Sequence, residues 1–552
     1  MNSPEPISKE RAKMAALEAA AALPGPDPVP TVTYRSAGKT LIIGSAADVG
    51  LWAEGLCTQL ELAVLLTDAP IAKGPEPARL YPAHRGHDVR VEGWLGAFVV
   101  TWEGGGEGGE GGEGRYDLVL DLSPAPLLQR HQKPPGYFAP AADLAARAKA
   151  VEELAEMIGE FETPKYFSYQ ERLCAHSRNR LVGCNACIEI CSAQAIAGAG
   201  DRIKVNPNLC AGCGACTTVC PTGALTYAYP SAAYTGARLR TLVSTYRDTG
   251  GGAPVLLFHS GEHGKALIGA LEQGAHGVPA HVLPVELEHT ASVGIDVWLS
   301  ALAYGAAQVM VLMTDEEAPQ YRTAIAAQMD IANIILNALG YEGQQCRLVQ
   351  AGASGELDAA LLQPVDTIGV AEPGAFNIMA EKRNTLDLAL SHLSAHAPLK
   401  PEYVALPAGA PFGAVKVDTA KCSLCMACVG ACPASALMDS PTMPQLRFVE
   451  KNCVQCGLCE TTCPEDAIVL DPRMSFAATW NKPVVLNETE PFCCIRCSKP
   501  FGTLQMVQNM LGKLGGHPAF AGNLDRLKMC GDCRVVDMMK SGDTARVVGR
   551  KP

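Results

Sequence analysis

The sequence predicts an α/β multidomain protein. Two α/β units with parallel sheets are expected to alternate with two small cysteine-rich α+β domains, followed by a C-terminal cysteine-knuckle unit. Three observations predict this class: the length, the alternation of apolar runs with amphipathic stretches, and the clustered cysteines. A chain of 552 residues exceeds the size at which one core keeps growing. With 48% hydrophobic and 18% charged residues, it has enough apolar material for several cores.

We place the domain boundaries where the sequence pattern changes. Residues 1–30 are expected to form a flexible or helical tail. The expected domains are an α/β unit at 31–165, a cysteine-rich domain at 166–230, a second α/β unit at 231–400, a second cysteine-rich domain at 413–475 and a cysteine-knuckle unit at 488–552.

The first α/β unit is predicted from three apolar runs. "TLIIG" at 40–44, "AVLL" at 63–66 and "LVLDL" at 118–122 are typical of buried strands separated by helical stretches. The Gly- and Glu-rich segment at 103–114 predicts a flexible hairpin loop. From Ala141, "AADLAARAKAVEELAEMIGEF" predicts an amphipathic helix that leads into the first cysteine-rich domain.

The second α/β unit is predicted from four further apolar runs. They are "PVLLF" at 254–258, "HVLPV" at 281–285, "VMVLM" at 309–313 and "RLVQ" at 347–350. Helical stretches such as "RTAIAAQMDIANIILNAL" alternate with these runs, and this alternation is typical of a parallel sheet.

The chain is expected to be cytoplasmic, to bind no nucleic acid and to have no membrane span. Its N-terminus carries acidic residues without the apolar segment of a signal peptide, and no run of about 18 apolar residues could span a bilayer. The net charge of -12 comes without the clustered Lys/Arg surface that phosphate binding needs. An acidic surface favours protein partners; the sequence predicts no oligomeric state.

The cysteines indicate metal binding, because a reducing compartment disfavours disulfides and a dense cysteine pattern there usually holds metal. Sixteen of the 23 cysteines fall into four runs. The runs are Cys174, Cys184, Cys187 and Cys191; Cys210, Cys213, Cys216 and Cys220; Cys422, Cys425, Cys428 and Cys432; and Cys453, Cys456, Cys459 and Cys463.

The last two runs follow the spacing C-x2-C-x2-C-x3-C-P. In this pattern a tight loop presents three thiolates to one [4Fe-4S] cluster, and the fourth cysteine reaches the neighbouring cluster. The predicted ligand sets are the Cys422 set (Cys422, Cys425, Cys428 and Cys463) and the Cys453 set (Cys453, Cys456, Cys459 and Cys432). Residues of about 413–472 resemble the bacterial two-cluster ferredoxin domain.

The first two runs predict a second domain of this kind, although one run is irregular. Cys174 lies ten positions before Cys184, with Leu181 where a regular run has its first ligand, and Ser192 stands where the other runs have proline. The predicted sets are the Cys174 set (Cys174, Cys184, Cys187 and Cys220) and the Cys210 set (Cys210, Cys213, Cys216 and Cys191).

The Cys174 site holds four irons only if the insertion "AHSRNRLVG" loops out and returns Cys174 to the cluster. Otherwise the cluster is a three-iron one, and His176 becomes a candidate substitute ligand. We expect His176 instead to be a surface histidine in a polar loop.

Two C-x2-C knuckles near the C-terminus predict a further metal site. Cys494, Cys497, Cys530 and Cys533 can surround one ion tetrahedrally, which suits structural zinc and also a rubredoxin-type iron. We favour zinc in a ribbon-like knuckle, with Cys493 as a less well-spaced substitute for Cys494. The isolated Cys57 and Cys346 are expected to be buried apolar residues.

The central region carries a second resemblance. From Val285, "VELEHTASVGIDVWLSALAYGAAQVMVL" is similar to the delta subunit of methyl-viologen-reducing hydrogenase, a likeness that covers about 255–365. That family carries a [2Fe-2S] centre on cysteines, whereas this stretch offers only Cys346. The resemblance therefore implies the fold and a docking role without the cluster.

The whole domain order resembles a bacterial family of cytosolic 4Fe-4S proteins found beside molybdenum formate dehydrogenase components. With four [4Fe-4S] clusters and no catalytic constellation in view, we expect a non-catalytic electron-transfer component of an oxidoreductase system. Its partner would be a redox protein of dehydrogenase or hydrogenase type. The alternative is a maturation or docking factor for a molybdoenzyme or iron–sulfur enzyme.

Overall fold

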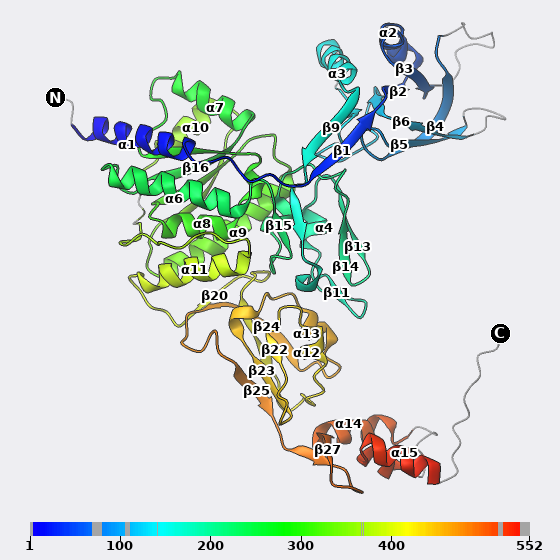
Figure 1. Cartoon of the computed structure of the whole chain (residues 1–552), viewed down its shortest axis with the longest axis vertical. Helices are drawn as coiled ribbons and strands as arrows, with labels where there is room; N and C mark the ends of the chain where they lie inside the picture. Colours follow the sequence, from blue (N-terminus) through cyan, green and yellow to red (C-terminus); the bar gives the residue numbers. More distant parts are fainter. Residues whose placement is uncertain are drawn as a thin grey trace.

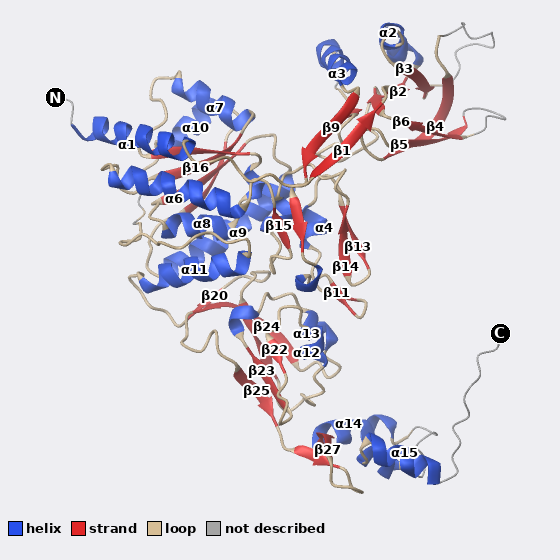
Figure 2. Cartoon of the chain, in the orientation of Figure 1, coloured by secondary structure: helices blue, strands red, loops and turns tan. Residues whose placement is uncertain are grey.

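The computed structural model describes residues 4–68, 80–104, 111–140, 142–365, 367, 369–516 and 523–540. Figure 1 shows an α/β unit at the upper right, a large central body, and a small C-terminal unit that projects from the lower end. Figure 2 shows that the helices gather around the central sheet, while short strands predominate on the right and below it.

The first α/β unit contains a seven-stranded sheet in the order β6-β5-β4-β3-β2-β7-β8. Its strands are β2 (Lys39–Gly44), β3 (Glu61–Leu66), β4 (Ala83–Glu92), β5 (Phe98–Gly104), β6 (Gly112–Tyr116), β7 (Leu118–Asp121) and β8 (Tyr137–Phe138). Helices α2 (Ala46–Leu56) and α3 (Leu144–Glu156) contribute to the apolar cluster that also contains Ile42, Val64 and Leu120.

The expectation of a wholly parallel sheet is wrong at one edge. Strands β4, β3, β2, β7 and β8 are parallel, but β5 pairs antiparallel with β4, and β6 pairs antiparallel with β5. The reason is the short connection between β4 and β5, where Gly93 and Gly96 have φ of 109° and 80°, because a short turn can join antiparallel strands only. The predicted hairpin of 103–114 has paired flanks, and its middle, 105–110, lies outside the described residues.

The amphipathic helix predicted from Ala141 is shorter than expected. It ends at Glu156, and the segment that follows is strand β9 (Gly159–Pro164), which pairs antiparallel with β1 (Thr31–Ser36). The chain leaves the helical path at the cap residue Met157, with φ of -88° and ψ of 42°, and Gly159 follows with φ of 129°, a conformation open to glycine, at the start of the strand. In Figure 1 this ribbon connects the first unit to the central body.

The central α/β unit has the predicted parallel sheet, in the order β17-β16-β18-β19. Its strands are β16 (Val255–Ser260), β17 (Val282–Leu287), β18 (Gln308–Met313) and β19 (Cys346–Gln350). Its helices are α6 (Ala232–Asp248), α7 (His263–Glu272), α8 (Ile295–Ala303), α9 (Pro319–Ala338), α10 (Ser354–Leu361) and α11 (Lys382–Ala395). Two apolar clusters flank the sheet, one with α6, α8, α9 and α11 and one with α7 and α10.

The N-terminal segment is a helix, α1 (Pro4–Ala21), that packs against the central unit. Ala12, Ala16 and Ala20 are buried in the same apolar cluster as helix α6. The Lys13 Nζ donates to the carbonyl of Val278 at 3.1 Å. Small side chains at this spacing let α1 lie close to α6, so the tail completes a domain that begins more than 200 residues later.

The two cysteine-rich domains share one layout: an outer strand pair, an inner hairpin and two short helices. The first has β10 (Phe167–Tyr169) paired with β15 (Leu225–Tyr227), β13 (Ile196–Ala199) with β14 (Arg202–Val205), and helices α4 (Ala186–Ile190) and α5 (Ala215–Thr218). The second has β21 (Gly413–Val417) paired with β24 (Ile468–Ser475), β22 (Leu437–Met438) with β23 (Gln445–Phe448), and helices α12 (Ala427–Ala431) and α13 (Leu458–Thr462).

The second domain carries two additional strands. They are β20 (Tyr403–Ala405), which pairs with β24, and β25 (Val484–Glu488), which pairs with β23. Strand β25 leads the chain away toward the C-terminal unit, as Figure 1 shows.

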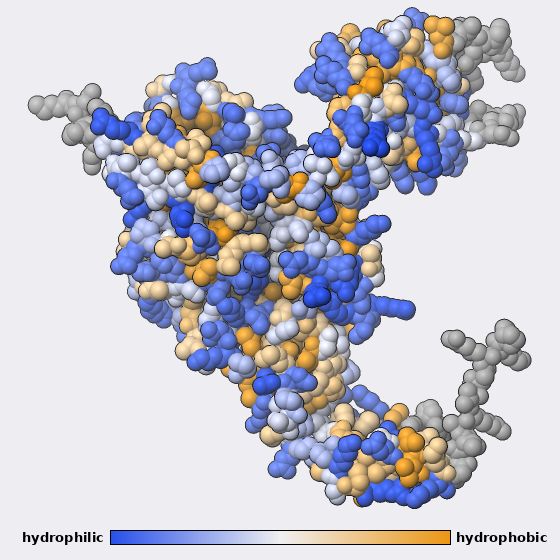
Figure 3. Space-filling view, in the orientation of Figure 1, coloured by the Kyte–Doolittle hydropathy of each residue, from blue (hydrophilic) through white to orange (hydrophobic). Residues whose placement is uncertain are grey.

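The C-terminal unit is a hairpin of β26 (Pro491–Cys493) and β27 (Pro500–Thr503) with helices α14 (Leu504–Leu514) and α15 (Gly531–Lys540). It is anchored to the second cysteine-rich domain, where the Thr503 hydroxyl donates to the Ser423 carbonyl at 2.9 Å. Polar residues cover most of the face seen in Figure 3. Among the described helices, none has both the length and the apolar character needed to cross a bilayer.

Candidate metal centres

The cysteines of the second domain surround two separate cavities. One cavity, with about 340 Å³ of empty space, is lined by all members of the Cys422 set. The other, with about 360 Å³, is lined by all members of the Cys453 set. In each cavity three thiols come from one run and the fourth from the other run, which is the crossing that the spacing predicts.

Backbone conformation explains how a short run directs three thiols into one cavity. In the two regular runs of this domain, the residues two and four positions after the first cysteine have positive φ: Leu424 and Met426 at 55° and 60°, Gln455 and Gly457 at 54° and 79°. Non-glycine residues adopt this conformation at a cost of about 1–3 kcal/mol each. Such strain is kept where the surroundings enforce it, as at a ligand-binding loop.

A second repeated turn follows each crossing cysteine. The third residue after it has positive φ in all four runs: Gln194, Gly223, Ser435 and Asp466 at 52°, 72°, 51° and 47°. This turn points a backbone N–H back at the crossing sulfur. Such donors stabilise a thiolate and tune a bound cluster. The bonds are Ala195 N–H to Cys191 Sγ at 3.2 Å, Leu225 N–H to Cys220 Sγ at 3.5 Å, Ala436 N–H to Cys432 Sγ at 3.2 Å and Ala467 N–H to Cys463 Sγ at 3.3 Å.

The first domain groups its cysteines in the same way. Burial raises the pKa of the Cys187 thiol to about 12, and the charges of Cys220, Cys184 and Cys174 add to this rise. Cys187 therefore lies within electrostatic range of every other member of the Cys174 set. Because burial disfavours the thiolate, a bound cation is what would keep these sulfurs deprotonated.

The Cys210 set is also assembled. Burial raises the pKa of the Cys216 thiol well above its ordinary value, and the charges of Cys213, Cys210 and Cys191 raise it further. The run beginning at Cys210 has the regular loop, since Gly212 and Gly214 both have φ of 74°.

The insertion before Cys184 forms a hairpin that returns Cys174 to the site. Strands β11 (Ser177–Arg178) and β12 (Leu181–Val182) pair across a turn, and the Cys184 N–H donates to the Ala175 carbonyl at 3.0 Å. The hairpin thus closes the gap that the irregular spacing opens. Cys174 is buried beside Cys184 and Cys187.

His176 is not the surface residue that we expected from its polar loop. It is buried, with 8% of its surface exposed, and its Nδ1 lies 3.1 Å from the carbonyl oxygen of Cys184. Gly198 of strand β13 lies against its ring, since a Cβ there would come within 2.9 Å of Nε2, so the β13–β14 hairpin helps to cover it. Nδ1 is therefore engaged with the backbone rather than turned toward a sulfur.

The two cysteine-rich domains contact each other through their cysteine loops. Ala175 of the first domain packs with Ala431 and Leu458 of the second, and Cys184 and Cys456 pack against this small cluster. The charge of Cys184 also contributes, after burial and nearer neighbours, to the raised pKa of the Cys456 thiol, which reaches about 11.

The same electrostatic evidence orders the four sets. Within the first domain, the charge of Cys187 helps to raise the pKa of the Cys216 thiol. Within the second, the charge of Cys428 helps to raise the pKa of the Cys459 thiol. Cys184 and Cys456 lie on either side of the same small buried cluster at the domain junction. These neighbours together give a series: the Cys210 set, the Cys174 set, the Cys453 set and the Cys422 set.

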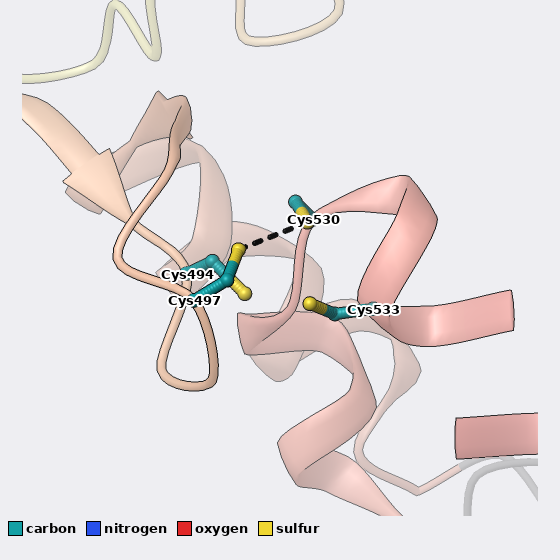
Figure 4. A group of neighbouring side chains, drawn as sticks. All are labelled: Cys494, Cys497, Cys530 and Cys533. Carbon is teal, nitrogen blue, oxygen red and sulfur yellow. Dashed lines mark hydrogen bonds between the residues drawn. The ribbon is translucent and has the colours of Figure 1, made fainter. Parts of the chain in front are cut away.

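The C-terminal thiols form a different kind of site. Figure 4 shows that Cys494 and Cys497, from the loop between β26 and β27, face Cys530 and Cys533 at the start of α15. The four sulfurs lie within 4.8 Å of one another, and those of Cys497 and Cys530 are 3.6 Å apart. Tetrahedral Zn–S bonds of about 2.3 Å separate neighbouring sulfurs by roughly 3.8 Å, so the group fits a single ion.

The local electrostatics select Cys494 over Cys493. Although burial acts in the opposite direction, hydrogen bonds from the N–H groups of Cys530, Arg496 and Cys497 lower the pKa of the Cys494 thiol to about 6. Cys493 is exposed and lies outside the group. The other sixteen cysteines form no such tight group among the described residues, so their wider spacing suits a larger cofactor than one ion.

The two isolated cysteines differ from each other. Cys346 is fully buried, as we expected, in strand β19. Cys57 is only half-buried, because it caps the C-terminal end of helix α2 at the rim of the first apolar core.

Comparison with known proteins supports the iron–sulfur interpretation. A 4Fe-4S binding domain matches residues 203–226, and a 4Fe-4S dicluster domain matches residues 421–468. The chain therefore contains two 4Fe-4S ferredoxin-type domains, which supports the binding of iron–sulfur clusters. The first match leaves out the irregular run from Cys174 to Cys191, in line with its unusual spacing. No curated protein matches the chain.

Sequence reasoning missed three side chains of the central unit that contact the cysteine loops. The Tyr321 hydroxyl donates to Cys213 Sγ at 3.1 Å, and Lys382 and Arg383 bind backbone carbonyls of the ligand loops. Nothing in their local sequence distinguishes them from exposed helix residues, because the contacts cross between domains.

Proposed function

We propose that the protein is a non-catalytic electron-transfer component that relays single electrons through four [4Fe-4S] clusters. Each of the four cysteine sets would hold one cluster, which when bound would supply one-electron transfer. The observation that carries this proposal is the packing of Cys184 and Cys456 against the same buried cluster of Ala175, Ala431 and Leu458, which brings one set of each ferredoxin-type domain to their junction.

The protein's own residues would hold the sites in a dry and fixed arrangement. Ala175, Ala431 and Leu458 are almost fully buried at the junction of the two domains, so they exclude water between the two central sets. Backbone N–H groups donate to the crossing sulfurs, as described above. Burial and such hydrogen bonds are two of the means by which a protein sets a cluster's reduction potential.

A dehydrogenase or hydrogenase would be the redox partner. The resemblance of the whole domain order to proteins found beside molybdenum formate dehydrogenase components supports the first. The resemblance of the central unit to a hydrogenase subunit supports the second, with this unit as the docking platform. The protein itself would transfer electrons without catalysing the partner's reaction.

The C-terminal unit would hold a structural zinc ion on Cys494, Cys497, Cys530 and Cys533. The unit has a short hairpin and two helices, which is little material for a core, and metal binding supplies folding free energy to small domains of this kind. A Cys530→Ala variant should lose the zinc and keep its cluster iron. A rubredoxin-type site would instead give one iron and no zinc in the same analysis.

Anaerobic purification followed by metal analysis and EPR spectroscopy tests the relay. The ligand sets require about sixteen irons per chain and an uptake of about four electrons. The reduced protein, mixed with a formate dehydrogenase or hydrogenase catalytic subunit and its oxidised substrate, should be re-oxidised as fast as the partner turns over. A colourless preparation with little iron would refute the proposal. Activation of an apo-enzyme without cluster turnover would favour the maturation role instead.

A further inference from the structure

Two adjacent cations stand at the start of helix α11 and reach opposite ways. Lys382 is buried, with 9% of its surface exposed, and Arg383 is partly buried. Lys382 contacts the first ferredoxin-type domain, whereas Arg383 contacts the second. One turn of one helix therefore touches both domains on either side of their junction.

Lys382 is bound to the loop that carries Cys220. Its Nζ donates to the carbonyl oxygens of Thr217 at 3.2 Å and Cys220 at 3.3 Å, and also to that of Thr218. Three acceptors require the three protons of an ammonium group. Lys382 is thus a cation placed against the Cys174 set, of which Cys220 is the crossing member.

Arg383 is bound to the loop that begins the Cys453 set. Its guanidinium donates to the carbonyls of Lys451 at 2.8 Å, Cys453 at 3.4 Å and Pro411 at 2.9 Å, and it stacks over Phe412. A guanidinium is always protonated in proteins, so Arg383 is a cation in this position.

This placement is unfavourable for cations unless negative charge lies nearby. The N-terminal end of a helix carries a partial positive charge, and burial removes the hydration of both groups. In the part of the chain that the structure describes, neither cation forms an ion pair, although Asp296 and Asp387 act on them from beyond contact distance. The nearest concentrations of negative charge would be the thiolates of the Cys174 and Cys453 sets.

We infer that Lys382 and Arg383 are positioning residues that raise the reduction potentials of the two central clusters, those of the Cys174 and Cys453 sets. This inference rests on the proposed function. Reduction adds one electron to a cluster that its thiolates already make negative. A fixed positive charge at short range stabilises the reduced form, and the low polarity of a buried site strengthens this effect.

The arrangement also predicts which cation has the larger effect. Arg383 is only partly buried and lines a pocket between the two domains that opens to solvent, so water screens part of its charge. Lys382 borders the same cavity, but its ammonium is enclosed by three carbonyls. Loss of the Lys382 charge should therefore lower the reduction potential of the Cys174-set cluster more than loss of the Arg383 charge lowers that of the Cys453-set cluster.

The test is an EPR-monitored redox titration of the full-length, iron-loaded protein and its variants. Lys382→Met and Arg383→Met remove the charges at similar side-chain length, and Lys382→Arg and Arg383→Lys retain them. Lys416→Met is the matched control, because it removes an exposed cation of the second domain, with 71% of its side chain accessible.

Each charge-removing variant should lower one midpoint potential, a different one for each variant, and leave the others in place. For Lys382→Met we expect at least a tenfold weaker one-electron reduction, which corresponds to about 59 mV. The charge-retaining variants and the control should titrate like the wild type. Unchanged midpoint potentials in both Met variants would overturn the inference. So would potentials that fall in Lys382→Arg and Arg383→Lys as far as in the Met variants.

Iron content keeps the test decisive if a variant loses a cluster. Iron that is lost in Arg383→Met and retained in Arg383→Lys would support the role of the charge, and loss in both would contradict it. If the wild type binds about sixteen irons and relays electrons while both Met variants keep the wild-type potentials, that result would refute this inference alone. A wild type without clusters would refute the proposed function.

Discussion

The two ferredoxin-type domains bring their cysteines together by different local means. The second domain uses two regular runs whose tight loops have positive φ at fixed positions, such as Met426 and Gln455. The first domain has one such loop and one hairpin, whose hydrogen bond between Cys184 and Ala175 replaces the missing spacing. The same grouping of thiols can therefore come from local covalent spacing or from hydrogen-bonded structure.

This difference has a consequence for robustness. A regular loop depends on a few consecutive residues, whereas the Cys174 set depends on the whole of 175–183 remaining folded as a hairpin. The same hairpin lies at the junction with the second domain, where Gly183 approaches Leu458. We therefore expect the two domains to respond differently to equivalent changes.

The largest effect should come from removing the third cysteine of a run in either domain. Cys428→Ala and Cys187→Ala each take away a buried ligand, so each should lose one whole cluster, about a quarter of the iron. Iron analysis with EPR measures this loss. Cys346→Ala, which removes an equally buried thiol outside the sets, should retain all the iron. Equal iron in Cys428→Ala and the wild type would contradict the assigned ligands.

The next largest effect should separate the two domains. Cys174 is held by the hairpin, apart from the remaining ligands of its run. Its replacement by alanine should therefore leave a [3Fe-4S] cluster, with a loss of about one iron and a new EPR signal in the oxidised protein. His176→Ala should retain the iron, since His176 Nδ1 already faces a backbone carbonyl. Iron loss from His176→Ala equal to that from Cys174→Ala would identify the histidine as a ligand.

A smaller effect is expected at the junction between the domains. A Cβ at Gly183 would lie 2.6 Å from Leu458 Cγ and 2.8 Å from the Ala175 carbonyl oxygen. Gly183→Ala should cost about 1–3 kcal/mol of stability by overpacking and slow electron equilibration between the domains. Thermal unfolding and stopped-flow spectroscopy measure the two effects. At Gly430 a Cβ would meet nothing within 4 Å, so Gly430→Ala is the control. Equal stability and equal electron-equilibration rates in the two variants would contradict the role of this junction in electron transfer.

The smallest effect concerns the Cys210 set. Tyr321→Phe removes one hydrogen bond to Cys213 Sγ, and a net contribution of about 1 kcal/mol corresponds to roughly 40 mV for one electron. Because the donor stabilises the more negative reduced state, the potential should fall. Tyr341→Phe, which removes a buried hydroxyl bonded to the Leu393 carbonyl, should leave every potential unchanged. A rise in potential on Tyr321→Phe would contradict this reasoning.

The fold was predictable from sequence where the signal is periodic and local. The strands at 40–44, 63–66 and 118–122 and the parallel sheet of the central unit are confirmed. The antiparallel edge of the first sheet and the early end of helix α3 were not foreseen. Both depend on backbone conformations that the apolar pattern does not report, those of Gly93 and Gly96 at the first and of Met157 at the second.

The candidate sites divide in the same way. The tetrathiolate group follows from two knuckles, but only the folded chain distinguishes Cys494, which receives three backbone hydrogen bonds, from exposed Cys493. His176 looked like a surface residue because its neighbours are polar, and it is buried because Gly198 of the β13–β14 hairpin lies against its ring. In each case burial depends on which distant segment covers the residue.

The sequence by itself determined the four cysteine runs and the chemistry they indicate, because ligand spacing along a tight loop is a local, covalent property. Tertiary structure decided how the two ferredoxin-type domains meet at Cys184 and Cys456, and that Lys382 and Arg383 lie against them. These contacts join segments at least 70 residues apart in the sequence. Their formation depends on the packing of the central α/β unit between the domains, and no local pattern encodes it.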